Sequence, residues 1–388
     1  MTVRTPVYLD HHATTPPDPR VLAVLERVHR EHWGNPASAG HAYGWAAAQV
    51  EEEARAHVAA LLGAEPREIL FTSGATEADN LAVLGTAAAF AARGRHLVTT
   101  NLEHDAVAGP VAALVARGWE ATVVPTGPDG LVAAADVAAA IRPDTVLVSV
   151  IAAQNEIGTI QPLAAIGAVC RERGVLLHSD AAQAVGRIPL DVRALGLGLL
   201  SCSAHKLHGP QGVGALWLSR RDPRAVVEPL CHGGGQERGL RPGTPAVAAI
   251  AGFGEACRIA RLEMQEEGLR VAGLRDRLWQ RLRADLPDVR LNGAASPRLP
   301  GNLNLSFAGV PAGSLAGALT VLAVSSGSAC SSADAQPSRI LAAIGVPEDL
   351  AGASLRLGLG RGTTVAEVDF AAERITAAVT RLRAQSPS

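Results

Sequence analysis

The sequence predicts an α/β protein: a larger part built on a mainly parallel sheet of seven strands, and a smaller part that is α+β. Short apolar runs alternate with helical stretches through the middle of the chain, the order that βαβ units produce. One of these runs, Val146–Ile151, is nearly continuous, as is typical of a parallel strand buried on both faces. After about Pro245 the pattern changes to long helices followed by separated strands, which indicates a second, smaller domain.

The seven strands are expected, in chain order, at Glu68–Thr72, His96–Thr100, Ala121–Val124, Val146–Ile151, Val175–Ser179, Leu197–Cys202 and Val213–Leu218. The helices expected between and after them are Glu77–Ala92, Ala106–Arg117, Leu163–Arg173 and Pro245–Gln265. A long connecting helix, Ala246–Leu286, then leads to strands near Leu303–Phe307, Leu322–Ser325 and Ser354–Leu359 and to a final helix, Val365–Ala384. We therefore predict a large domain of residues 15–255 and a small domain of residues 1–14 and 256–388.

The composition is that of a globular protein, with 388 residues of which 48% are hydrophobic and 19% charged. The net charge is −2 and the basic residues are dispersed, so the sequence indicates no nucleic-acid surface. No apolar run reaches the roughly 18 residues of a membrane helix, and Met1–Leu9 does not resemble a signal peptide. The five cysteines, Cys170, Cys202, Cys231, Cys257 and Cys330, form no Cys-x-x-Cys pair, which predicts reduced thiols, a cytoplasmic location and no metal site.

Lys206 is the one lysine among 35 lysines and arginines. An arginine guanidinium stays protonated, whereas a buried lysine amine can lose its proton and form a Schiff base. Lys206 also follows the expected strand Leu197–Cys202, at the sheet edge where α/β proteins bind ligands. The lysine is therefore a candidate for covalent chemistry. The alternative is a drift of the composition toward arginine that left one lysine by chance.

The segment Phe71–Asn80 joins an expected strand to a helix through a turn of small residues. Free backbone N–H groups at a helix start, together with the hydroxyls of Ser73 and Thr76, form an anion site. The alternative is a plain capping turn, with Thr76 as the cap and Asp79 three residues on. The interpretation as an anion site is significant only if the site lies beside a lysine that can hold a phosphorylated aldehyde, because the site would then bind the phosphate.

Polar residues also follow other expected strands. Asp180 ends the apolar run that begins at Val175, where a carboxylate needs a cationic partner. The protonated ring nitrogen of pyridoxal phosphate (PLP) is such a partner, while capping of a following helix is the alternative. His104, Asn155 and Glu156 also come directly after strands. Because such strand ends meet at one edge of a sheet, the sequence predicts a cofactor site there.

Cys330 lies in the run Ser325–Asp334, in which nearly every residue is small. A structural cysteine normally sits among larger apolar side chains, so Cys330 is predicted to be a thiolate nucleophile and the other four cysteines packing residues. Arg356 lies within an apolar strand, where a guanidinium needs an anion. Two anions are possible for this guanidinium. One is a substrate carboxylate held by two hydrogen bonds, and the other is a carboxylate of the protein in a structural ion pair.

Four motifs occur together: Phe-Thr-Ser-Gly-Ala-Thr-Glu at 71–77, His-Ser-Asp-Ala-Ala-Gln at 178–183, Ser-Ala-His-Lys at 203–206 and Ser-Ser-Gly-Ser-Ala-Cys at 325–330. With them the sequence resembles the cysteine desulfurases, class V aminotransferase relatives with fold-type I PLP architecture. The resemblance runs from Tyr8-Leu9-Asp10 to Leu359-Gly360-Arg361, nearly the whole chain. The cysteine motif is similar to that of the NifS/IscS branch.

The resemblance implies a role for each matching residue. Lys206 would hold PLP, Asp180 would pair with the pyridine nitrogen, Gln183 would bond the ring hydroxyl, and His104 would stack on the ring and assist proton transfer. The phosphate would be held by Ala75, Thr76, Ser203 and His205, and by Thr244 from the partner subunit of a homodimer. Asn155 and Arg356 would hold the substrate carboxylate, and Cys330 would take the sulfur.

The activity implied is that of a PLP-dependent cysteine desulfurase, which converts L-cysteine to L-alanine and leaves a persulfide on Cys330 for an acceptor protein such as an iron–sulfur scaffold. A selenocysteine lyase or another class V PLP enzyme is the nearest alternative, and a non-catalytic partner-binding module is a more distant one. A metal hydrolase using His11, His12, His205 and His208 is disfavoured, because no acidic residue has metal-motif spacing with them. The chain departs from the family at His11, His12, Asp105 and Gln211 and in its short tail, so the identity of the acceptor stays open.

Overall fold

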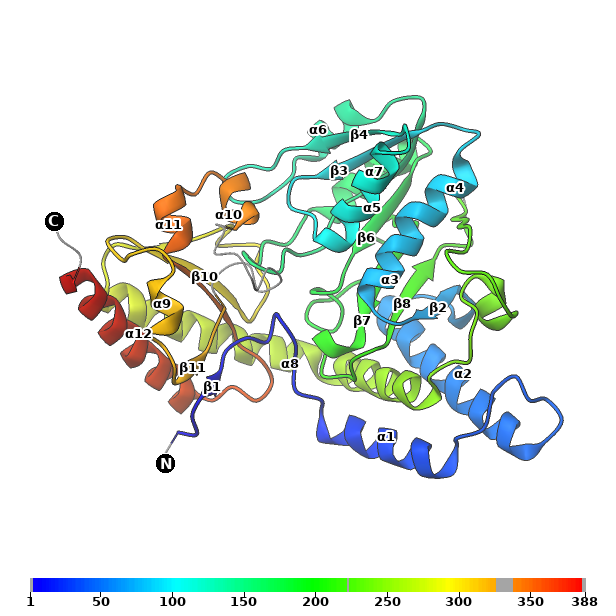
Figure 1. Ribbon diagram of the computed structural model, residues 1–388, viewed down its shortest axis with the longest axis horizontal. Helices are drawn as coiled ribbons and strands as arrows, with labels where there is room; N and C mark the ends of the chain where they lie inside the picture. Colours follow the sequence, from blue (N-terminus) through cyan, green and yellow to red (C-terminus); the bar gives the residue numbers. More distant parts are fainter. Residues whose placement is uncertain (1–2, 222, 326–337, 386–388) are drawn as a thin grey trace.

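The computed structural model describes residues 3–221, 223–325 and 338–385. Its centre is a seven-stranded sheet with the strand order β2-β8-β7-β6-β5-β3-β4 (Figure 1). The strands are β2 (Ile69–Thr72), β3 (His96–Thr100), β4 (Glu120–Val124), β5 (Thr145–Ser149), β6 (Leu176–Asp180), β7 (Leu199–Ser203) and β8 (Gly214–Leu218). β8 pairs antiparallel with β2 and β7, and the other pairs are parallel. The predicted mainly parallel sheet is confirmed, with strand ends within two residues of those expected.

Helices cover both faces of this sheet. They are α1 (Pro19–Glu31), α2 (Ala42–Leu62), α3 (Ala75–Asn80), α4 (Thr86–Phe90), α5 (Asp105–Val115), α6 (Ala134–Ala140), α7 (Leu163–Glu172) and α8 (Val247–Asp285). Leu200 of β7 packs in one core with Phe253 of α8, whereas its neighbour Leu199 packs in another with Val111 of α5. Successive strand residues point to opposite faces, so the sheet is buried between two helical layers.

A second region follows α8. Its three-stranded antiparallel sheet has the order β12-β10-β9, with β9 at Val289–Leu291, β10 at Asn302–Phe307 and β12 at Ser354–Gly358. A parallel pair joins β1 (Val7–Tyr8) to β11 (Leu322–Ala323), so the N-terminal segment belongs to this region. The helices here are α9 (Ser314–Gly317), α10 (Arg339–Ala343), α11 (Glu348–Gly352) and α12 (Val365–Gln385).

The long helix α8 lies under both regions (Figure 1). Ile250 and Phe253 in its first half belong to a core of the large sheet. Val271 and Leu278 in its second half belong to the core that contains β10, β12 and α12. The core against which α8 packs therefore changes in the middle of one continuous helix. The predicted domain boundary between residues 255 and 256 stays a prediction.

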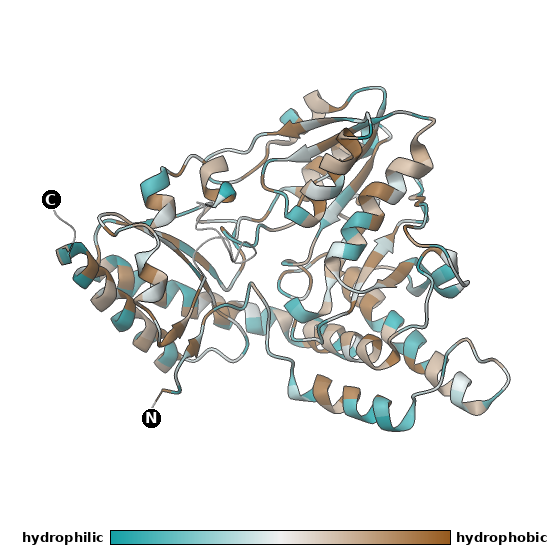
Figure 2. Cartoon of the chain, in the orientation of Figure 1, coloured by the Kyte–Doolittle hydropathy of each residue, from teal (hydrophilic) through white to brown (hydrophobic). Residues whose placement is uncertain are grey.

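One expected helix needs correction, and several helices were not expected, α1 and α2 being the longest of them. The buried face of α2 consists largely of alanine, such as Ala47 and Ala54, which gives little apolar contrast. The single helix expected over Glu77–Ala92 is interrupted by a π-helical turn at Leu81–Gly85. Figure 2 shows the central strands as predominantly hydrophobic, whereas α1 carries both hydrophilic and hydrophobic residues.

Candidate active site

The polar residues that follow the parallel strands come together around one cavity. It has a volume of about 600 Å³ and lies at the carboxyl edge of the large sheet, as ligand sites in open α/β sheets do. Of the residues predicted for the site, ten line this cavity: Ala75, Thr76, His104, Asn155, Asp180, Gln183, Ser203, His205, Lys206 and Arg356. They come from five segments of the large sheet and from β12 of the second sheet.

Lys206 ends a 3₁₀ turn, Ala204–Lys206, directly after β7. Its Nζ donates hydrogen bonds to the backbone carbonyls of His12, at 2.7 Å, and Ala13, at 2.8 Å. The amine is therefore held at the cavity wall by the N-terminal segment, which the sequence did not predict. Its own carbonyl accepts a hydrogen bond from Arg187 Nη2 at 3.0 Å.

Asp180 occupies the tip of β6 and is 5% exposed. Its Oδ1 accepts a hydrogen bond from Ala182 N at 2.9 Å, but a turn follows and not a helix, so the interpretation as a helix cap is wrong. Burial raises the pKa of Asp180, while His104 and Lys206 act in the opposite direction. A buried carboxylate that lines a cavity accommodates a cationic ring nitrogen, so Asp180 fits the pyridine of PLP.

One part of the cavity wall carries hydroxyl and backbone donors. α3 begins at Ala75 with Gly74 before it, so Thr76 lies inside the helix and the alternative of a Thr76 cap is wrong. Thr76 and Ser203 line this part of the cavity together with His205. Burial first, and then Lys206 and Arg187, lower the pKa of His205 to about 4, so this ring is neutral near pH 7. A helix start with hydroxyls and a neutral imidazole fits a phosphate.

His104 and Gln183 are each fixed by neighbours. His104 caps α5, its Nδ1 accepting a hydrogen bond from Ala106 N at 3.1 Å, so the neutral ring carries its proton on Nε2. Gln183 donates from Nε2 to the carbonyl of His12 at 2.9 Å and accepts from Arg187 Nη1 at 2.9 Å. Arg187 thus contacts both Gln183 and Lys206, a role that was not predicted from the sequence.

Arg356 is 2% exposed, and its Nη2 lies 2.8 Å from Asp10 Oδ1. The structural ion pair considered for it is therefore present. Arg356 also lines the cavity, and within the described part of the chain its Nε has no hydrogen-bond partner. Asn155 lines the same cavity from the loop after β5. An unpaired guanidinium N–H beside an amide is a suitable arrangement for a carboxylate.

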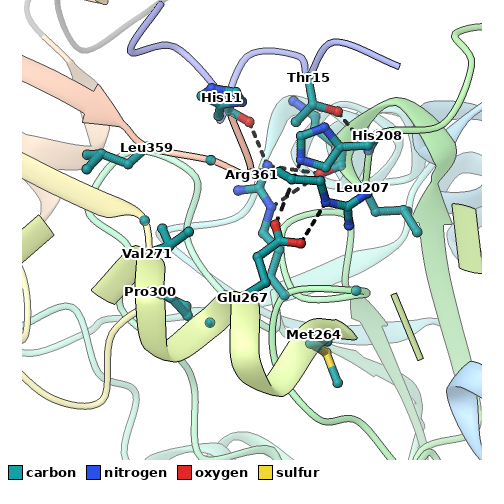
Figure 3. Close-up of a pocket in the computed structure, with 16 residues that line it drawn as sticks. His11, Thr15, Leu207, His208, Met264, Glu267, Val271, Pro300, Leu359 and Arg361 are labelled. Atoms are coloured by element: carbon teal, nitrogen blue, oxygen red, sulfur yellow. Dashed lines mark hydrogen bonds and ion pairs between the residues drawn. The ribbon is translucent and has the colours of Figure 1, made fainter. Parts of the chain in front are cut away.

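Lys206 also lines a second, smaller cavity, which Figure 3 shows. His11 and His208 face it with their ring centres 6.0 Å apart, and Glu267 forms an ion pair with Arg361. His12 instead lines the main cavity. Among the described residues no group of three or more His, Cys, Asp or Glu side chains could hold a metal ion.

Two predicted site residues lie elsewhere. Thr244 is exposed and does not line the cavity of its own chain. Cys330 lies outside the described residues. Cys170, Cys202 and Cys257 are buried, as expected for packing residues, and burial raises the pKa of Cys170 and Cys202 to about 12. Cys231 is exposed, so the interpretation of it as a packing residue is wrong.

Comparison with known proteins identifies the family. Residues 7–370 match the model of the aminotransferase class-V family. The cysteine desulfurase of Mus musculus is 50% identical over 99% of this chain and 84% of its own length, and the cysteine desulfurase IscS of Stutzerimonas stutzeri is 49% identical over 99% and 95%. A solved structure of a NifS-like protein superposes with a TM-score of 0.90 at 35% identity, covering 97% of this chain and all of the other. The chain belongs to the aminotransferase class-V family, in its NifS/IscS-type cysteine desulfurase branch.

Proposed function

We propose that this chain is a PLP-dependent cysteine desulfurase that converts L-cysteine to L-alanine and retains the sulfur as a persulfide on Cys330. The observation that carries the proposal is the meeting of the one lysine, Lys206, with the buried Asp180 in a single cavity. Relatives about half identical over the whole chain bear the name of this enzyme.

The residues of the cavity fit PLP from one end to the other. Lys206 would bind its aldehyde carbon, Asp180 would face its ring nitrogen, and Gln183 its ring hydroxyl. Ala75, Thr76, Ser203 and His205 would surround its phosphate. When bound, the cofactor draws electrons away from the Cα of an attached amino acid, which makes the Cα proton easier to remove.

The protein side chains then handle protons and sulfur. The Lys206 amine, directed by the carbonyls of His12 and Ala13, is placed to take the Cα proton. His104 assists proton transfer from its position at the start of α5, while Asn155 and Arg356 hold the substrate carboxylate. The Cys330 thiolate attacks the substrate sulfur: an S–S bond forms, the Cβ–S bond breaks, and its electron pair stays with the three-carbon product.

We infer further that the enzyme acts as a homodimer, with Thr244 of each subunit reaching the phosphate site of the other. Thr244 is exposed and outside its own cavity. Trp33, which follows α1, stacks on Tyr43 at the start of α2, and both rings are exposed, as is that of Trp45 in the same turn; these exposed aromatic side chains support an interface at the start of α2. The same proposal includes the division into two domains, delivery of sulfur to an acceptor such as an iron–sulfur scaffold, and a cytoplasmic location. None of the helices described is both long and apolar enough to cross a bilayer.

The single lysine makes a direct test available. Borohydride reduction of the purified yellow protein is expected to fix PLP on the one peptide that contains Lys206, as detected by mass spectrometry. Lys206→Arg keeps the positive charge and removes the reactive amine, so it should fold normally by circular dichroism and lose desulfurase turnover. Substantial sulfide release by Lys206→Arg would exclude the proposed role.

A further inference from the structure

The two residues proposed to grip the substrate carboxylate belong to different sheets. Asn155 lies in the loop after β5 of the large sheet, and Arg356 lies on β12 of the three-stranded sheet. A grip of this kind works only if the spacing between the sheets is fixed, because hydrogen bonds weaken steeply with distance and misalignment. The contact that fixes the spacing is a cluster of buried polar groups, Glu156, Asn302 and Asn304, called the β10 junction below.

The β10 junction is centred on the backbone carbonyl of Glu156, the residue after Asn155. This oxygen accepts one hydrogen bond from Asn302 Nδ2 at 3.1 Å and one from Asn304 Nδ2 at 3.2 Å. Both asparagines are fully buried and lie two residues apart on β10, so their side chains share one face of the strand. One carbonyl therefore uses both lone pairs to dock the Asn155 loop on β10.

Asn304 also stands directly across from Arg356 in the antiparallel pair of β10 and β12. The N–H and C=O of Arg356 both bond to Ser325 on its other side, at 2.7 and 3.3 Å. Asn304 and Arg356 therefore form a non-hydrogen-bonded pair, in which Cα atoms approach to about 4.5 Å and side chains lie closest. Asn304 is thus bonded to the residue next to Asn155 and lies directly opposite Arg356, the two residues proposed to hold the carboxylate.

The surrounding contacts keep Asn304 in this orientation. Its Oδ1 accepts a hydrogen bond from Asn292 Nδ2 at 2.8 Å, which leaves Nδ2 to face Glu156. The loop fits closely here as well. Gly158 has a φ of +72°, and a Cβ built on it would lie 2.4 Å from Asn302 Oδ1.

We propose that Asn304 is a positioning residue for substrate recognition: by donating to the Glu156 carbonyl from its place opposite Arg356, it sets the distance between Asn155 and Arg356 for an α-carboxylate. The inference rests on the proposed function and deepens it. It predicts that loss of the Asn304 donor weakens ligands that carry a carboxylate and leaves other amines unaffected.

The test compares L-cysteine with cysteamine, which is the same molecule without the carboxylate. Asn304→Asp removes the donor to Glu156 but keeps an acceptor for Asn292. In the holoenzyme, the half-saturating L-cysteine concentration for the initial visible absorbance change should rise at least roughly tenfold, as expected when a hydrogen bond from Asn155 or Arg356 to the charged substrate carboxylate is lost through misplacement. Cysteamine should titrate as it does in wild type.

Ser306→Ala is the matched control. Ser306 lies on the same strand, is buried and accepts a hydrogen bond from Asn292, but within the described part of the chain it donates none to the Glu156 carbonyl. It should leave both titrations unchanged. Asn304→Ser serves as a second variant should Asn304→Asp unfold at a lower temperature.

The possible outcomes separate the two proposals. If both Asn304 variants fold and bind L-cysteine as wild type does, the positioning role is refuted. If L-cysteine and cysteamine weaken equally, Asn304 acts on general stability and the positioning role is refuted as well. If wild type itself gives no absorbance change with L-cysteine, the proposed function fails, and the inference about Asn304 fails with it.

Discussion

Glu103 provides a quantitative test of how the buried site is held. Its side chain is 1% exposed, and Oε1 accepts hydrogen bonds from Thr100 Oγ1 at 2.7 Å and Ile151 N at 2.9 Å. Oε2 has no partner among the described residues. Burial raises the pKa of Glu103 from its ordinary value of 4.5 to about 8, so the folded protein keeps this carboxyl protonated at neutral pH.

The sign of the effect follows from proton binding. Between pH 4.5 and about 8 the folded protein holds the Glu103 proton and the unfolded chain does not, so unfolding releases a proton. The free energy of unfolding therefore falls as pH rises, by about 1.4 kcal/mol per pH unit and by about 5 kcal/mol in total. The contribution is fully present below pH 4.5 and is lost above about pH 8.

Glu103→Gln cannot ionise and should remove this fall. An amide also mimics the protonated carboxyl, since it keeps an acceptor for Ile151 and a donor at the position of Oε2. Relative to wild type, the variant should gain about 3 kcal/mol between pH 5 and pH 7. Urea unfolding of the cofactor-free protein, followed by circular dichroism at several pH values, measures the difference directly.

Glu53→Gln, on an exposed part of α2, is the matched control for loss of one carboxylate. A constant difference in unfolding free energy between wild type and Glu103→Gln from pH 5 to pH 8 would refute the reasoning. It would mean that Glu103 ionises with the same pKa in the folded and unfolded chain.

Two further variants address the chemistry. Cys330→Ala should stay yellow and still change its spectrum with L-cysteine, yet form no persulfide. Mass spectrometry of the wild type should find one added sulfur on Cys330. An adduct confined to the other cysteines would contradict the mechanism. Asp180→Asn should slow turnover roughly 10- to 150-fold, the equivalent of about 1.5–3 kcal/mol for a hydrogen bond to a charged group. The cofactor-free form of this variant should unfold at no lower temperature than wild type, because burial raises the pKa of Asp180 and the ionised carboxylate therefore costs stability. A normal turnover rate would show that Asp180 does not hold the ring nitrogen.

The sequence was informative where chemistry is local. Lys206, Asp180, His104 and Asn155 each follow an apolar run directly, and parallel strand ends meet at one edge, so their meeting in one cavity could be predicted. The strands were likewise predictable as short apolar runs, and α8 as a long stretch without proline between Pro245 and Pro287. α2 was not, because alanine fills much of its buried face and gives a weak period.

The supports of the site could not be predicted, because they join positions far apart in the chain. His12 and Lys206 are 194 residues apart, and Asn304 and Glu156 are 148 apart. Arg187 lies in an unremarkable turn sequence, and its contacts to Gln183 and Lys206 follow only from tertiary packing. Nothing local to Asn304 distinguishes a buried junction asparagine from a polar residue at a strand end.

The placement of the N-terminal segment has a consequence for synthesis of the protein. β1 pairs with β11 at Leu322 and Ala323, and Asp10 pairs with Arg356. These pairings of Val7, Tyr8 and Asp10 therefore cannot form until β11 and β12 have been made, and the adjoining residues His12 and Ala13 supply the carbonyls that hold Lys206. Formation of these contacts is slow because their sequence separation is large. A nascent chain can thus fold its central sheet first, but it can anchor the segment that holds Lys206 only after β11 and β12 have been made.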